Sequence, residues 1–234
     1  MKFSDLSGVM KKTSLTIDTI ENPFEHYYII RMNIPDGMKW VAGEHGLFFL
    51  PNRRVKQLQK FRPFSVASIP EEGKVIIGIK TKEPLSSFKK ELITMQKGEE
   101  VTVRGPFGWF KIQDSKSPIV LFASGVGITP IRALFNQIAT DSSRPVHLVY
   151  VSNDYHLFKS ELEKIAAENA QMTIQCLKNR TEASSALAAL SKQYGNQAYY
   201  YISGSGKVIS SVKKTLKSKQ ISGKRIITDP FFGY

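Results

Sequence analysis

Two short segments contain residue types whose spacing could hold a phosphorylated ligand. The first, residues 62–68, offers Arg62 for bidentate pairing with a phosphate, the Phe64 ring for stacking and the Ser65 hydroxyl as a donor. The second, residues 125–130, has glycines at both 125 and 127, which permit a tight turn and the close approach of a ligand. Taken singly, each segment also has a plain structural interpretation: a strand with a surface arginine and a core phenylalanine, and a turn that only joins a strand to a helix.

The remaining reactive side chains indicate no metal or nucleophilic site. A single cysteine, Cys176, cannot form an internal disulfide, a zinc site or an iron–sulfur cluster. The four histidines show neither an i,i+4 pair nor metal-ligand spacing, so we expect them to have surface or half-buried roles: His26, His45, His147 and His156.

The glycine turn lies within a repeated alternation of strands and helices. A continuous apolar run at 119–123 precedes it, as in a strand buried on both faces, and Ile131, Leu134, Phe135 and Ile138 follow at helical spacing. We predict further strands at 148–151, 172–177, 199–202 and 225–228, and helices at 158–167, 184–194 and 208–217. This alternation predicts a doubly wound parallel sheet. Ligands of such sheets gather at the carboxyl ends of the strands, and the helix amides near Pro130 would suit a pyrophosphate.

The first half of the chain has a different texture. Short β-rich runs bounded by Gly and Pro predict a small antiparallel barrel or sandwich, with strands at 27–32, 46–50, 63–68, 75–79 and 101–104. One helix is expected at 85–95, where Phe88, Leu92 and Met95 share a face. We therefore predict a barrel domain at 1–113, a polar linker at 114–117 and a nucleotide-binding domain at 118–234.

The composition is that of a globular, basic protein. The 234 residues include 33 Lys and Arg against 20 Asp and Glu, a formal net charge of +13, which first suggests nucleic acid or an acidic membrane as a partner. No stretch approaches the ~18 apolar residues that cross a membrane, and the polar N-terminus does not resemble a signal peptide. We expect a soluble cytoplasmic protein without a membrane span.

Four motifs, in order along residues 15–234, resemble those of the ferredoxin–NADP(H) reductase family. Residues 62–68 resemble its R-x-[YF]-S-x-x-S flavin signature and residues 105–108 its G-P-x-G barrel turn. Residues 125–130 are similar to its G-x-G-x-T-P nicotinamide turn, and the final Phe-Phe-Gly-Tyr to the F-x-G-Y ending of compact bacterial members. The resemblance implies an antiparallel six-stranded β-barrel flavin domain before the parallel-sheet domain, with FAD and either NADPH or NADH as cofactors.

The resemblance also implies site residues in the barrel. Arg62 would hold the FAD pyrophosphate, Phe64 would lie against the flavin in place of the commoner tyrosine, and Ser65 would face the flavin N5. Either Ser86 or Ser87 would supply a donor to the pyrophosphate. The complete set of flavin-binding residues implied for this domain is Arg62, Pro63, Phe64, Ser65, Ser68, Ser86 and Ser87.

In the second domain the resemblance implies nicotinamide-binding residues at Gly125, Gly127, Thr129 and Pro130, with Thr129 nearest the reacting rings. Ser203 and Gly204 stand where many members have Cys-Gly, and Phe231 would cover the flavin face. Together with Ser65 and Thr129, Phe231 is predicted to be catalytic. Arg180 occupies a position where NADPH-using members often carry arginine, whereas Asp154 favours NADH. We expect NADPH and leave NADH open.

The implied activity is hydride transfer from NAD(P)H to FAD, followed by electron transfer to a separate carrier protein. An acidic ferredoxin or flavodoxin would be attracted by the excess of cations, and we expect no nucleic-acid partner and no metal. Three alternatives stay open: an NAD(P)H:flavin or small-acceptor reductase, a regulatory flavoprotein subunit, and a non-catalytic nucleotide- or polyanion-binding module.

Overall fold

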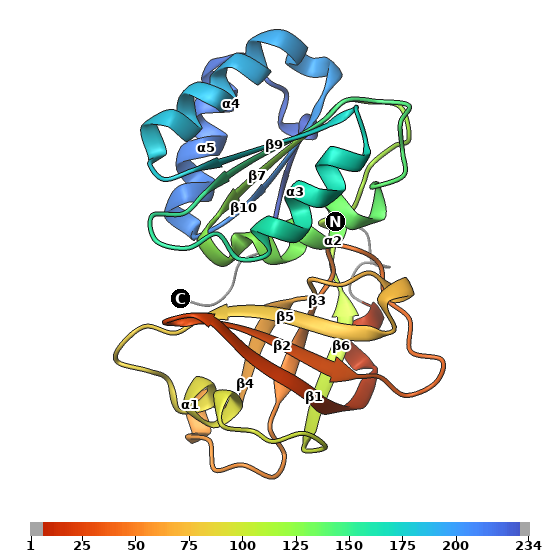
Figure 1. Ribbon diagram of the computed structural model, residues 1–234, viewed down its shortest axis with the longest axis vertical. Helices are drawn as coiled ribbons and strands as arrows, with labels where there is room; N and C mark the ends of the chain where they lie inside the picture. The colour runs from red at the N-terminus through yellow and green to blue at the C-terminus, as the bar shows by residue number, and fades with distance from the viewer. Residues whose placement is uncertain (1–6, 230–234) are drawn as a thin grey trace. The chain divides into compact units, whose positions relative to one another are not determined.

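The computed structural model describes residues 7–229, and the chain divides into two compact units between Lys111 and Ile112. Each unit has its own sheet (Figure 1). Each also has its own hydrophobic core. The predicted linker at 114–117 lies in the second unit. Within the described part of the chain, no helix is both long and apolar enough to cross a membrane.

The first unit is built on six antiparallel strands in the order β4-β3-β6-β1-β2-β5. The strands are β1 (Lys12–Phe24), β2 (Tyr27–Asn33), β3 (His45–Phe49), β4 (Phe61–Ser65), β5 (Lys74–Lys80) and β6 (Glu100–Phe107). The backbone N–H of Ala67, just after β4, donates to the carbonyl of Ile76 in β5 at 2.7 Å and so joins the two edges of the sheet. This confirms the predicted antiparallel six-stranded domain.

Among the described residues of this unit, one short α-helix, α1 (Ser87–Ile93), packs against the interior of the sheet. The predicted apolar face is present, because Phe88, Leu92 and Met95 are all buried in the core of the unit. Strand β1, which was not predicted, contributes Leu15 and Ile17 to the same core.

The second unit has a five-stranded parallel sheet in the order β11-β10-β7-β8-β9, which confirms the predicted doubly wound architecture. Its strands are β7 (Ile119–Ser124), β8 (Val146–Val151), β9 (Met172–Leu177), β10 (Tyr199–Ser203) and β11 (Ile226–Thr228). The helices α4 (Arg180–Tyr194) and α5 (Gly206–Ser218) pack on one face, and α2 (Ile128–Gln137) and α3 (Lys159–Glu168) lie on the other (Figure 1).

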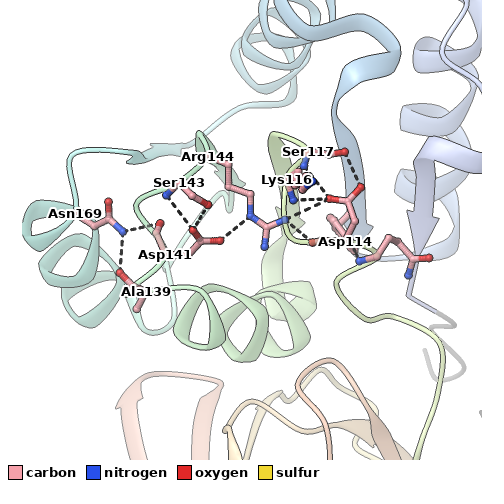
Figure 2. Close-up of polar contacts among 10 residues, drawn as sticks. Asp114, Lys116, Ser117, Ala139, Asp141, Ser143, Arg144 and Asn169 are labelled. Atoms are coloured by element: carbon pink, nitrogen blue, oxygen red, sulfur yellow. Dashed lines mark hydrogen bonds and ion pairs between the residues drawn. The ribbon is translucent and has the colours of Figure 1, made fainter.

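A polar cluster fixes the beginning of the second unit (Figure 2). The buried Arg144 guanidinium donates to the Asp141 carboxylate at 2.8 Å and to the backbone carbonyl of Asp114. The Asp114 carboxylate in turn accepts from Ser117 and from the Lys116 N–H. The segment predicted as a linker is therefore a hydrogen-bonded turn held by the second unit.

Candidate functional site

The parallel sheet places two turns side by side at the carboxyl ends of its central strands. From β7 the chain proceeds through β8 to β9 in one direction, and then returns to β10 on the other side of β7. The reversal makes the β7–β10 boundary the topological switch point, where α/β sheets bind ligands. The turn at Gly125–Gly127 follows β7 there, and beside it Ser203 ends β10 and Gly204 follows.

Gly127 is required by the contact between these two turns. A Cβ atom at this position would lie 2.5 Å from the Ser203 carbonyl oxygen and 2.6 Å from the Gly204 nitrogen. Gly125 differs, because a Cβ there would meet nothing within 4 Å, but its φ of +55° favours glycine. The two glycines thus serve different purposes: one shapes the turn and the other allows the turns to touch.

Thr129 and Pro130 lie in the first turn of α2, as predicted, and both are buried. The Thr129 hydroxyl donates to the carbonyl of Val126 at 2.7 Å, which closes the turn onto the helix. The neighbouring Arg132, also buried, pairs with Glu161 of α3. Thr129 therefore positions the backbone of the glycine turn.

Ser203 is fully buried at the end of β10, and its hydroxyl donates to the Asp229 carboxylate at 3.1 Å. The Asp229 N–H donates back to the carbonyl of Ile202. The serine that stands in place of the expected cysteine is thereby connected to the segment that follows β11. Phe231, predicted to be catalytic, lies outside the described residues.

The groups predicted to select the nucleotide lie at the carboxyl ends of β8 and β9. The Asp154 carboxylate accepts from the Ser152 hydroxyl at 3.3 Å and the Tyr155 N–H at 2.9 Å, so it is engaged within its own loop. Arg180 is exposed at the start of α4, where Asn179 caps the helix through a bond from the Glu182 N–H.

In the first unit, β4 presents Arg62 and Phe64 on one face of the strand, since side chains alternate with a period of two. Phe64 is partly buried, with ring centroids 5.6 Å from Phe48 and 6.0 Å from Phe88 of α1. Arg62 is also partly exposed, and its guanidinium donates to the carbonyl of Phe61. A cation and an aromatic ring therefore share the face of β4 that lies beside α1.

Ser65 ends β4 on the opposite face, opposite His45 of β3 in the register, and Pro63 pairs with Leu47. His45 is buried, its ring lies 4.5 Å from that of Phe107, and its Nδ1 has no hydrogen-bond partner among the described residues. Burial lowers the pKa of His45 to about 4, so the imidazole is neutral at pH 7.

Three further predicted serines have hydroxyls that bond within the unit. Ser68 is fully buried and its hydroxyl accepts from the Ile76 N–H at 3.0 Å. Ser86 caps α1 by accepting from the Lys89 N–H, as a helix-capping serine does. Ser87 donates to the Gln59 side chain at 2.8 Å and accepts from the Lys56 N–H.

Lys89 was not predicted as a site residue, and the structure places it beside the Arg62–Phe64 face. The Lys89 ammonium reaches from α1 to the carbonyl of Lys80 at the end of β5, 2.7 Å away. Burial lowers the pKa of Lys89, and the charge of Arg62 lowers it further. Only the packing of Phe88 on Phe64 reveals this proximity.

Comparison with known proteins supports the motifs. The chain is 33% identical over 140 residues to the electron transfer component of toluate 1,2-dioxygenase from Pseudomonas putida, a match that covers 56% of this chain and 40% of that protein. It is 23% identical over 161 residues to a subunit of the Na⁺-translocating NADH-quinone reductase from Shewanella putrefaciens, covering 64% of this chain and 53% of the relative. The chain thus spans about half the length of these relatives, and no family model matches it.

The solved structures agree over nearly the whole chain. Ferredoxin-NADP⁺ reductase from Plasmodium falciparum superimposes with a TM-score of 0.78 at 17% identity, covering 97% of this chain and 99% of that one. This chain has the ferredoxin reductase-like fold. The FAD/NAD-binding domain of nitric oxide dioxygenase from Vibrio cholerae shares this ferredoxin reductase-like fold with a TM-score of 0.77 at 18% identity, covering 94% and 98% of the two chains. The resemblance drawn from the four motifs is confirmed.

Proposed function

We propose that this ferredoxin reductase-like chain is an NAD(P)H-dependent FAD reductase that passes electrons to a separate acceptor. The observation that carries the proposal is the face of β4, where Arg62 and Phe64 lie together beside α1. The similarity of the chain to an electron transfer component and to one component of an NADH-quinone reductase supports the same activity.

The residues of the first unit fit FAD. Arg62 would pair with the diphosphate, since a guanidinium matches phosphate geometry, and the partly exposed Phe64 ring would stack on the flavin. Phe64 is held by Phe48 and Phe88, so its orientation is set before a ligand arrives. Ser65, at the end of the strand and opposite His45 in the register, would face the flavin N5.

The switch point of the second unit fits a nicotinamide nucleotide. Gly127 keeps the two turns in contact, and Thr129 holds the amides at the start of α2, where a pyrophosphate is stabilised. We propose NADPH as the preferred donor, because Asp154 is engaged by Ser152 and Tyr155 while Arg180 is exposed. When bound, the flavin would supply the redox chemistry, accepting a hydride and releasing single electrons.

We propose an acidic carrier protein as the electron acceptor. Residues 45–70 contain no Asp or Glu, and three of their cations are exposed: Arg54, Lys56 and Lys60. Within this segment the 3-10 turn at Gln57–Gln59 presents Leu58 with 97% of its surface exposed, and Gln59 anchors the turn to Ser87. An exposed leucine flanked in the sequence by Lys56 and Lys60 is complementary to an acidic protein surface.

The test is the visible spectrum of the purified protein, followed by anaerobic addition of NADPH or NADH. We expect a yellow protein whose flavin absorbance bleaches with NADPH, and an Arg62→Ala variant that retains far less FAD after gel filtration. A colourless wild-type protein that takes up no FAD, or a bound flavin that neither nucleotide reduces, would refute the proposal. If only small acceptors, and no acidic carrier, take up the electrons, the carrier assignment fails and the reductase assignment stands.

The nucleotide preference has its own test in Arg180→Ala. We expect the ratio of kcat/KM for NADPH to that for NADH to fall by about 10-fold or more, because a charge-assisted contact with the 2′-phosphate is lost. An unchanged ratio would exclude Arg180 from the nucleotide site.

A further inference from the structure

Lys89 is a partly buried cation that lies close to another cation. Its ammonium donates to the carbonyl of Lys80, and its position on α1 follows Phe88, which is fully buried. A lysine side chain in such a place usually extends its charge to solvent. Here the ammonium is directed instead toward the end of β5, where it bonds to the Lys80 carbonyl.

The packing of α1 on β4 brings Lys89 toward Arg62. The rings of Phe64 and Phe88 are 6.0 Å apart, and Arg62 precedes Phe64 by two residues on the same face of the strand. The charge of Arg62 acts on Lys89 to lower its pKa, in addition to the effect of burial. Two like charges therefore lie on neighbouring elements of the first unit, β4 and α1.

The two segments that carry these cations contain no acid. Residues 45–70 have neither Asp nor Glu, and residues 84–90 have none between Glu83 and Glu91. The Glu83 carboxylate accepts from the Leu85 N–H in its own turn. Like charges repel, so bringing Arg62 and Lys89 together costs free energy that a bound anion between them would recover.

We propose that Lys89 is a second phosphate-binding residue, which acts with Arg62 on the diphosphate of the flavin dinucleotide. This inference rests on the proposed function and deepens it, since it assigns a residue that the motifs do not contain. The ligand chemistry is a diphosphate, and inorganic pyrophosphate is the alternative source of the same group. Arg62 would supply planar, bidentate pairing and Lys89 a point charge from the side of α1.

The experiment compares Lys89→Met with Lys90→Met, an exposed lysine one position along the same helix. FAD and riboflavin affinities of the apoprotein are measured by quenching of flavin fluorescence, because riboflavin has the ring system without a phosphate. We expect Lys89→Met to weaken FAD binding by about 10- to 100-fold, the loss of one charge-assisted hydrogen bond, with riboflavin affinity unchanged. Lys89→Arg should restore FAD affinity, and Lys90→Met should leave both affinities within about twofold of wild type.

The outcomes separate the two proposals. Equal weakening of FAD and riboflavin binding by Lys89→Met would show a structural role for Lys89 and overturn the inference. FAD affinity that falls in Arg62→Ala but not in Lys89→Met would overturn it too, while the proposed function stands. A wild-type protein that binds inorganic pyrophosphate at this site but not FAD would overturn both the inference and the proposed function.

Discussion

Gly127→Ala is expected to force apart the two turns at the switch point. The added Cβ would lie 2.5 Å from the Ser203 carbonyl oxygen, whereas ordinary contact begins at 3.4 Å, so the turns must separate by about 0.9 Å. Both sides of the contact are backbone, and Ser203 is paired with Ala123 in the β10–β7 ladder, so neither side can rotate away. Overpacking of this kind costs about 1–3 kcal/mol of unfolding free energy. In a chain of this length that corresponds to a fall in Tm of roughly 2–12 °C.

Scanning calorimetry measures the effect, with Gly206→Ala as the matched control. A Cβ at Gly206, the first residue of α5, would meet nothing within 4 Å, so this variant should be neutral or stabilised by up to about 1 kcal/mol. Because the turn amides shift, Gly127→Ala should also weaken nicotinamide nucleotide binding, while Gly206→Ala should not. A Gly127→Ala protein with the wild-type Tm and nucleotide affinity would refute the close-contact argument.

Three other perturbations test the electrostatics. Arg144→Met should lower the unfolding free energy by about 1–3 kcal/mol in calorimetry, because buried Arg144 holds two partly exposed carboxylates; a change below about 0.5 kcal/mol would contradict this. Bonds from the Ser143 hydroxyl and N–H and from Arg144 lower the pKa of Asp141, so wild-type stability should fall as the pH drops below about 4, less steeply in Arg144→Met. Burial lowers the pKa of His45 to about 4, so on acidification the unfolded state is protonated at this histidine before the folded state. Stability should therefore decline as the pH falls from 6.5 to about 4, and His45→Gln should remove that decline. Lys56→Glu should slow reduction of an acidic carrier several-fold at low salt but leave reduction of a small neutral quinone unchanged. Lys219→Glu, at another exposed lysine, is a control of equal net charge. Equal slowing of carrier reduction in both variants would exclude docking near Lys56.

The parallel-sheet unit was predicted almost completely from the sequence. Strand β9 (Met172–Leu177) has the predicted bounds, and the other strands of its sheet differ by two residues or fewer at either end. Buried parallel strands are continuous apolar runs, which can be recognised in the sequence without knowing which strands pair with them. Helix α4 begins at Arg180 rather than 184, because the cap at Asn179 starts the helix before its first apolar residues.

Strand β1 was the main element that the sequence did not predict. Its outward positions carry polar and charged residues. Its identity as a strand depends on pairing with β2, which follows it after a turn, and with β6, which is distant in the sequence. Lys89 was missed for a related reason: in sequence it forms a Lys-Lys pair with Lys90, and only the packing of Phe88 against Phe64 separates a partly buried lysine from an exposed one. Long-range packing decides both cases.

Three hydroxyl groups of the motifs bond to the backbone. Thr129 bonds to Val126, Ser68 to Ile76 and Ser86 to the first turn of α1, so each fixes the position of nearby amides. A hydroxyl that is already engaged can be replaced at the cost of about one hydrogen bond, roughly 0.5–1.5 kcal/mol. A side chain added at Gly127 has no comparable relief, because it meets the backbone of a second turn. The nucleotide turn should therefore tolerate Thr129→Val better than Gly127→Ala. In this sequence pattern, stability depends more on the glycine than on the threonine hydroxyl.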